Sequence, residues 1–316
     1  DHPWLTTHPD FYEKDSTGKP TFTADWSDTR ELNFENREMQ DSMINTMKFW
    51  VNKTKIDGFR VDVAWGVPIT FWTRCLTDLK TIRPLFFLAE ADDAPLHNAG
   101  FDATYTWREY NVVKEVAAGK KDVTYLDTIF NTIDTSFMKG AWRLYFTSNH
   151  DENSWNKADY ETMPGIVHAP FAVLALTYNR TMPLIYSGQE EPVLRAIQFF
   201  EKDPIQFIKY ERAPFYTALL QLRNTNKVFG EQAQFKRLAV NNPKAIMAYQ
   251  RVFENDKVVV VLNLSNKAQV VQLELNGQAS KYKELFTGKQ FSNIQNSALP
   301  PWGYQVFVKM NEAINR

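Results

Sequence analysis

Four short apolar runs in this chain end in charged or amide side chains, and a helical pattern follows each of them. They are residues 56–63, 85–90, 143–149 and 183–190. When parallel strands alternate with helices, the carboxyl ends of the strands meet at one edge, and the active sites of parallel α/β barrels are built there. Four such ends in order are hard to explain as solvated strand ends. The pattern therefore predicts a parallel α/β fold with a functional site at those ends.

The stretch Gly58–Ala64, which reads GFRVDVA, places an arginine and an aspartate two residues apart. Residues i and i+2 of a strand point to the same face, so Arg60 and Asp62 should lie side by side. An adjacent guanidinium keeps a carboxylate ionised, which prepares that carboxylate to act as a nucleophile. A structural ion pair at a strand end is the alternative, and this stretch alone does not decide between the two.

Two further strand ends carry candidate residues. Glu90 closes an apolar run, where desolvation should raise its pKa and allow it to donate a proton. His150 and Asp151 directly follow the run 143–149. A lone histidine is more often a satisfied core residue than a functional one. The position of His150 between a strand end and Asp151 favours a functional histidine.

The stretches GFRVDVA, FFLAEA, FTSNHDE and PLIYSGQE, in that order, resemble four sequence regions of the α-amylase family of glycoside hydrolases. The stretch LNFENREM before them also resembles that family, and the resemblance extends over nearly the whole chain. It implies that Asp62 is the catalytic nucleophile and Glu90 the general acid/base. Asp151 would be the third carboxylate, which binds sugar hydroxyls and stabilises the transition state. Arg60 and His150 would be supporting residues that help to bind substrate.

The resemblance implies a retaining hydrolase that cleaves α-glucosidic bonds in α-glucans or malto-oligosaccharides by double displacement. This chemistry needs two carboxyl groups, one ionised and one protonated. In a retaining enzyme the two groups should lie roughly 5–6 Å apart, against about 6.5–9.5 Å in an inverting one. Two alternatives stay open. One is a transglycosylase on the same residues, and the other is a catalytically silent amylase-like protein that binds glucan.

The order of the motifs predicts strands 4 to 8 of a (β/α)8 TIM barrel, followed by an antiparallel β-sandwich domain. Residues 1–35 would be a remnant of the domain inserted after barrel strand 3, 36–230 the C-terminal part of the barrel, and 231–316 the sandwich, where apolar periodicity switches toward two. Five parallel strands cannot close a barrel. A missing N-terminal barrel segment is therefore expected in the parent polypeptide or in a second chain.

Many starch-cleaving members of the family have a Lys-His pair three and four residues after the nucleophile, whereas this chain has Trp65-Gly66. An indole can stack on a sugar ring, which makes Trp65 a candidate substrate-binding residue. The alternative is that Trp65 packs under the following helix. Which glucan is cut cannot be read from this position.

Composition excludes other classes of partner. The formal net charge of −1 provides no basic field for nucleic acid, and no apolar run reaches membrane-spanning length. We therefore expect an oligosaccharide or polysaccharide substrate, no nucleic acid and no membrane. The chemistry requires no cofactor. The family's structural calcium ion cannot be assigned to residues of this chain, so the metal ligands stay unknown. An extracellular or periplasmic location is favoured over a cytoplasmic one.

Overall fold

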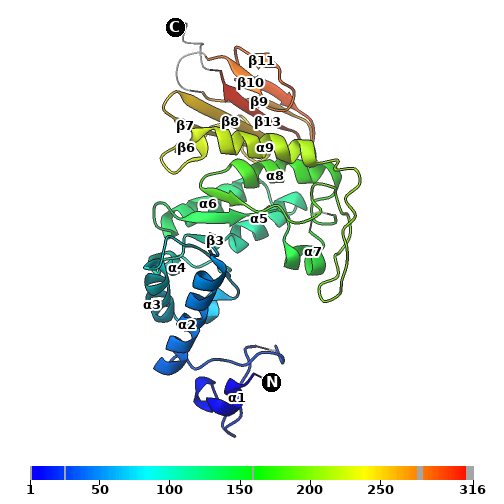
Figure 1. Cartoon of the computed structure of the whole chain (residues 1–316). Coiled ribbons are helices and arrows are strands. Elements are labelled where there is room, and N and C mark those ends of the chain that lie inside the picture. The colour runs from blue at the N-terminus through cyan, green and yellow to red at the C-terminus, as the bar shows by residue number, and fades with distance from the viewer. Residues whose placement is uncertain (1, 25, 159, 276–279, 311–316) are drawn as a thin grey trace. The chain divides into compact units, whose positions relative to one another are not determined.

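The computed structural model describes residues 2–24, 26–158, 160–275 and 280–310 (Figure 1). The chain forms two compact units, Asp1–Tyr105 and Thr106–Arg316. Within the described ranges, no helix is both long enough and apolar enough to cross a bilayer. The predicted division at residues 35 and 230 stays a prediction.

The first unit begins with short helical turns and a long helix. Its helices are α1 (Trp4–Thr7), η1 (Pro9–Phe11), α2 (Arg37–Thr54), η2 (Ala64–Gly66), α3 (Ile69–Lys80) and α4 (Pro95–Asn98). Helix α2 begins directly after Asn36, whose side chain accepts a hydrogen bond from Met39 N at 3.1 Å and so caps the helix. Met39, Ile44 and Val51 are buried along one side of α2. This stripe packs the core, as its helical spacing indicates.

Three parallel strands form the sheet of the first unit. They are β1 (Gly58–Val61), β2 (Phe86–Ala89) and β3 (Ala103–Tyr105). Strand β2 pairs with β1 on one side and with β3 on the other. Gly58 is required at the start of β1, because a Cβ atom there would lie 1.8 Å from the carbonyl oxygen of Phe86. Buried side chains of α3, such as Trp72, Cys75 and Leu76, cover this sheet together with Phe87 in one core.

The second unit begins with helices around two parallel strands. These elements are α5 (Trp107–Ala117), α6 (Val123–Ser136), β4 (Trp142–Tyr145), α7 (His150–Asn156), η3 (Gly165–Val167), α8 (His168–Thr177), β5 (Thr181–Pro183), α9 (Ala213–Thr225) and η4 (Lys227–Phe229). Strands β4 and β5 are parallel, with Arg143 opposite Thr181 and Tyr145 opposite Pro183. The βα alternation predicted from the apolar runs is present.

One predicted strand was misplaced. We expected a strand over 183–190, but β5 covers Thr181–Pro183, and only the Leu184 amide continues the ladder with a bond of 2.8 Å to Tyr145 O. The chain then turns at Gly188, whose φ is +91°. Gln189 stabilises that turn, since its Oε1 accepts from Tyr186 N at 2.8 Å. The apolar run therefore includes both a short strand and the turn that follows it.

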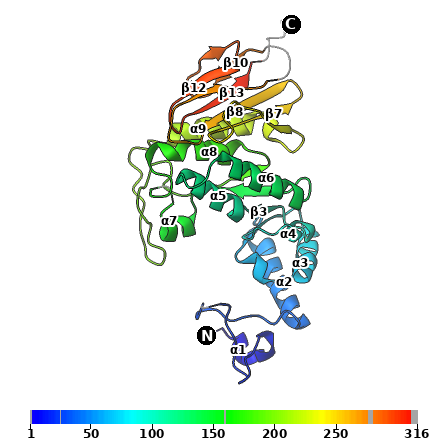
Figure 2. The same cartoon turned by 180° about the vertical axis from the view of Figure 1, so that it is seen from behind.

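The last part of the second unit is antiparallel. Its strands are β6 (Gln234–Arg237), β7 (Ile246–Phe253), β8 (Asp256–Asn263), β9 (Gln269–Gln272), β10 (Tyr282–Glu284), β11 (Gln290–Phe291), β12 (Asn296–Leu299) and β13 (Tyr304–Lys309). Six form a sheet in the order β11-β10-β13-β8-β7-β6, and β12 pairs with β9. The two sheets share one core that includes Val259, Val271 and Phe307. Helices α8 and α9 lie against the larger sheet (Figures 1 and 2).

The β7–β8 hairpin turns at Glu254 and Asn255, and Glu254 has a left-handed φ of +52°. The turn-forming pair Asn276-Gly277 of the sequence lies outside the described residues.

Candidate active site

Arg60 of β1 contacts both candidate catalytic carboxylates. Its Nη1 forms an ion pair with Asp62 Oδ1, and its Nη2 lies 3.1 Å from Glu90 Oε1. Asp62 and Glu90 come together because each follows the end of a strand, and the register of β1 and β2 sets Val61 opposite Ala89. Arg60 and Asp62 lie side by side, as their spacing predicts. One guanidinium therefore contacts two neighbouring carboxyl groups.

The two carboxyl groups differ in environment. The Glu90 side chain is 14% exposed, whereas that of Asp62 is 73% exposed. Burial desolvates Glu90 and raises its pKa above the ordinary value, and the charge and hydrogen bond of Asp62 add to the rise. The Val63 amide, 3.0 Å from Glu90 Oε2, and the Arg60 charge oppose it. The balance leaves Glu90 the group that holds its proton more firmly than an ordinary glutamate.

The two carboxyl groups interact with each other as well as with Arg60. The charge and a hydrogen bond of Asp62 contribute to the raised pKa of Glu90. Arg60 contacts both groups, so each gains from the same positive charge. The expected separation of roughly 5–6 Å for a retaining pair stays a prediction.

Val63 turns the chain away from the strand directly after Asp62. Its φ is +47°, in the left-handed region that β-branched residues rarely adopt, at a cost of roughly 1–3 kcal/mol. This conformation directs the Val63 amide toward Glu90 and starts η2. Trp65 lies in η2 and is 60% exposed, so it does not pack under α3. The buried indole is that of Trp72 in α3, which donates a hydrogen bond to Ala64 O at 3.0 Å.

The second unit places His150 and Asp151 in the first turn of α7. His150 Nε2 lies 3.3 Å from Asp151 Oδ2, and both side chains are partly exposed. Asn149 caps the helix, because its Oδ1 accepts from Glu152 N at 2.8 Å. Burial, with a further effect of the Asp151 charge, raises the pKa of Tyr186. His150 and Asp151, which can both bind hydroxyls, are thus held at the capped N-terminus of α7.

Sequence reasoning missed Tyr105 as a partner of Arg60. The Arg60 Nε donates to Tyr105 Oη at 3.4 Å, and the guanidinium carbon lies 5.6 Å from the centre of the Tyr105 ring. Tyr105 is buried at the end of β3. The signal in the sequence is the apolar run FDATYTW, which contains a strand that ends at Tyr105. Tyr105 fixes the orientation of the guanidinium that serves Asp62 and Glu90.

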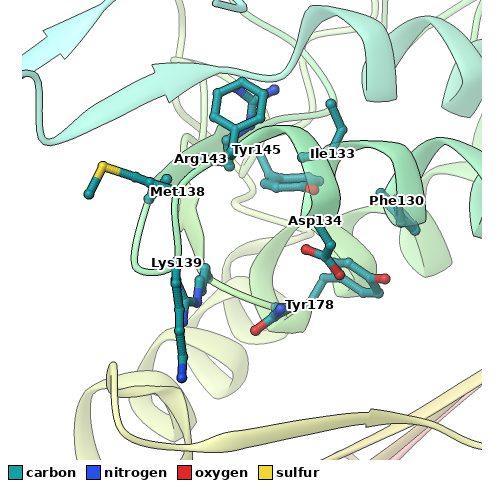
Figure 3. Close-up of a pocket in the computed structure, with 12 residues that line it drawn as sticks. Phe130, Ile133, Asp134, Met138, Lys139, Arg143, Tyr145 and Tyr178 are labelled. Carbon is teal, nitrogen blue, oxygen red and sulfur yellow. The ribbon is translucent and has the colours of Figure 1, made fainter. Parts of the chain in front are cut away.

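A cavity of about 440 Å³ lies elsewhere in the second unit (Figure 3). Its walls include Phe130 and Asp134 of α6, Arg143 of β4, and Tyr178. Burial raises the pKa of Asp134, and the charge of Arg180 opposes the rise. Lys139 and Arg180 precede β4 and β5, so the cavity is at the amino ends of these strands. Catalytic groups of parallel α/β barrels gather at the opposite ends. We therefore do not assign it to catalysis.

The residues that the structure describes contain no group of three or more His, Cys, Asp or Glu side chains able to hold a metal ion. Asp62 and Glu90 both contact Arg60, and a guanidinium at that position disfavours a cation. The carboxyl pair on Arg60 therefore does not fit a calcium ion, and no step is assigned to a metal.

Strands in βα units, carboxyl groups at the strand ends, and a following antiparallel domain define a partial TIM barrel with a C-terminal β domain. Comparison with known proteins agrees. Residues 15–78 match the family model described as "Alpha amylase, catalytic domain", and residues 235–306 match "Maltogenic Amylase, C-terminal domain". The first match includes Arg60 and Asp62.

Individual proteins are similar over most of the chain. Alpha-amylase 2 of Dictyoglomus thermophilum is 24% identical over 83% of this chain and 48% of its own length. An alpha-1,4-glucan:maltose-1-phosphate maltosyltransferase of Corynebacterium pseudotuberculosis is 24% identical over 98% of this chain and 48% of its own length. The chain thus spans about half the length of these relatives.

The crystal structure of a noncanonic maltogenic alpha-amylase from Thermotoga neapolitana has the same fold. It superposes with a TM-score of 0.82 at 21% identity and covers 96% of this chain and 71% of the other. The predicted fold class is confirmed, and so is the resemblance to the α-amylase family of glycoside hydrolases.

Proposed function

We propose that this chain carries the catalytic carboxylates of a retaining α-glycosidase that acts on α-glucans or malto-oligosaccharides. The observation that supports this most strongly is the placement of Asp62 and Glu90 on one guanidinium, with burial raising the pKa of Glu90. An exposed carboxylate beside Arg60 is suited to nucleophilic attack, and a buried carboxylic acid is suited to proton donation.

In the first step Asp62 attacks the anomeric carbon while Glu90 protonates the departing glycosidic oxygen. The bond between Asp62 and the sugar removes the negative charge of Asp62. That charge is one of the causes that raise the pKa of Glu90, so its loss helps Glu90 to stay deprotonated. In the second step Glu90 takes a proton from water, and the hydroxide formed releases the sugar from Asp62. The net configuration is retained.

The other candidates bind and orient. Arg60 holds both carboxyl groups, and Tyr105 holds Arg60. We assign Asp151 to sugar hydroxyls and transition-state stabilisation, with His150 as a hydrogen-bond donor to substrate. Trp65 is exposed two residues after Val63, as a ring that stacks on sugar must be.

The test compares how much activity the Glu90→Gln variant loses on substrates with different leaving groups. Glutamine cannot donate a proton, so hydrolysis of maltoheptaose should fall by roughly 10²- to 10⁴-fold. An activated aryl α-maltoside, whose leaving group needs little protonation, should lose much less. The matched control is Asp57→Asn, a carboxylate at the opposite end of β1 whose side chain is 98% exposed. Equal losses on both substrates would refute the acid role of Glu90.

Transfer to a second sugar is the alternative that the maltosyltransferase relative favours. Product ratios at high acceptor concentration separate the two activities. Mostly transfer products would replace the hydrolase with a transglycosylase, and no turnover of any glucan would favour a silent binding protein.

We further propose that a strand outside these residues pairs with β1. Among the strands that the structure describes, β1 pairs with β2 alone and β5 with β4 alone. Free strand edges promote association, and closure of a barrel removes them. A cofactor-free reaction and an extracellular or periplasmic location also stay predictions.

A further inference from the structure

Exposed aromatic side chains gather next to His150 in the second unit. Trp155 of α7 is 58% exposed, and Phe200, in the loop between β5 and α9, is 82% exposed. Phe199 joins them, with ring centres 5.2 Å from Trp155 and 4.9 Å from Phe200. Phe199 also stacks on His150 at 6.1 Å with 26° between the planes. We call Trp155, Phe199 and Phe200 the aromatic platform.

The loop that carries two of these rings is held rigidly at its base. Arg195 and Asp203 close it with two hydrogen bonds of 2.5 and 2.6 Å. These bonds to Arg195 lower the pKa of Asp203 to about 2, so the closure persists at any ordinary pH. The Gln198 amide adds a bond of 3.0 Å to Asp203 Oδ2. Phe199 and Phe200 therefore lie within a loop that hydrogen bonds close.

The same loop is fixed to α7. Asn153 donates to Arg195 O at 3.2 Å and accepts from Ile197 N at 2.8 Å, and Ser154 donates to Ile197 O at 2.7 Å. Asn153 is buried, so water competes little for these bonds. Large apolar side chains at this exposure are normally withdrawn into a core, because exposing them costs free energy. A rigid support that keeps them in water indicates a binding surface.

The geometry of α7 relates the platform to the predicted substrate contacts. Trp155 lies four residues after Asp151, so the two side chains share one face of the helix. The rings continue from Asp151 and His150 toward the loop, and the polar residues Gln198, Glu201 and Lys202 flank Phe199 and Phe200 in sequence. Aromatic faces next to hydroxyl-binding groups match a sugar chain, which has apolar ring faces and polar edges.

We propose that the aromatic platform binds glucose units of an α-glucan next to those that His150 and Asp151 contact. The proposal rests on the proposed function, because His150 and Asp151 must contact substrate for the platform to extend that contact. It predicts a preference for long chains over short ones.

The test compares a long and a short substrate. The double variant Trp155→Ala/Phe200→Ala should raise the KM for maltoheptaose by about 2- to 10-fold per ring removed. Its kcat on 4-nitrophenyl α-maltoside should stay within about twofold of the original protein, because the proposal assigns the platform to the additional glucose units of a longer chain. The single variant Phe200→Trp keeps an aromatic ring at position 200, so it should retain most of the affinity for maltoheptaose. The control is Tyr125→Ala, an aromatic residue of α6 that is 51% exposed and should change neither constant.

A binding measurement keeps the inference separate from the proposed function. Maltoheptaose titrated into the original protein should produce heat that the double variant loses, whether or not any bond is cut. An unchanged KM and an unchanged heat in the folded double variant would overturn the platform. A change of oligomeric state in place of glucan affinity, measured by light scattering, would also overturn it and assign the rings to a protein contact.

Discussion

The candidate site residues of the two units differ in burial and in the groups that surround them. In the first unit a half-buried guanidinium, a buried tyrosine and a backbone amide surround the carboxyl pair. In the second unit His150 and Asp151 are partly exposed and adjoin exposed rings. Burial raises the pKa of Glu90, whereas the exposure of His150 and Asp151 allows them to contact a ligand. The contrast separates a region suited to chemistry from a region suited to binding.

The largest effect expected from this contrast concerns the nucleophile. Asp62→Ala should lower kcat by on the order of 10⁴-fold or more, because no carboxylate can then form the covalent intermediate. Thermal stability should change little, since the side chain is largely exposed. Azide should restore rate and form a glycosyl azide of inverted configuration, measured by NMR. Near-normal activity without azide would remove Asp62 from the mechanism.

Arg60→Met should have the next largest effect. Loss of one electrostatic contact to reacting groups lowers kcat/KM by roughly 10²- to 10³-fold. The Arg60 charge lowers the pKa of Glu90, so its removal should raise that pKa. The alkaline limb of the kcat/KM profile should therefore move to higher pH. Arg83→Met is the control, since Arg83 pairs with Asp57 at 3.5 Å away from the carboxyl pair. A limb that moves to lower pH would contradict the assignment.

Stability should depend on pH through Glu90. Burial raises its pKa in the folded state above the unfolded value, near the ordinary 4.5. Its contribution to stability is fully present below the unfolded pKa and is lost as pH rises through the folded pKa. Glutamine does not titrate, so the melting temperature of Glu90→Gln relative to the original protein should increase from pH 4 to pH 7. A difference that is constant over this range would show that burial does not raise the pKa.

The smallest effect concerns the support of the binding region. Asn149→Ala removes the cap of α7 and should lower the free energy of unfolding by about 1 kcal/mol, measured in urea. KM should rise modestly while the pH limbs stay in place, because Asn149 orients His150 and Asp151 and is not among the groups that shift the pKa of Glu90. Asn149→Asp, which keeps the capping oxygen, should recover the stability. A shifted alkaline limb would show that the two regions are not separate in function.

Sequence patterns predicted the strands and the residues at their ends better than the contacts between segments that are distant in sequence. The spacing of Arg60 and Asp62 on a strand, together with strand register, accounts for the contacts of the carboxyl pair. The strand at Thr181–Pro183 was misplaced because an apolar run does not distinguish a strand from the buried turn after it. The aromatic platform was not predicted, since it depends on how Asn153 and Asp203 hold a loop distant in sequence from α7. Local pattern does not encode such contacts.

The proposed mechanism requires Asp62 to form the bond to sugar. A 5-fluoro α-glycosyl fluoride, which slows the second step of a retaining enzyme, tests this directly by peptide mass spectrometry. We expect one added sugar on the peptide that contains Asp62, no label in Asp62→Ala, and unchanged labelling in Asp57→Asn. A label on Glu90 or Asp151, with Asp62 unmodified, would contradict it.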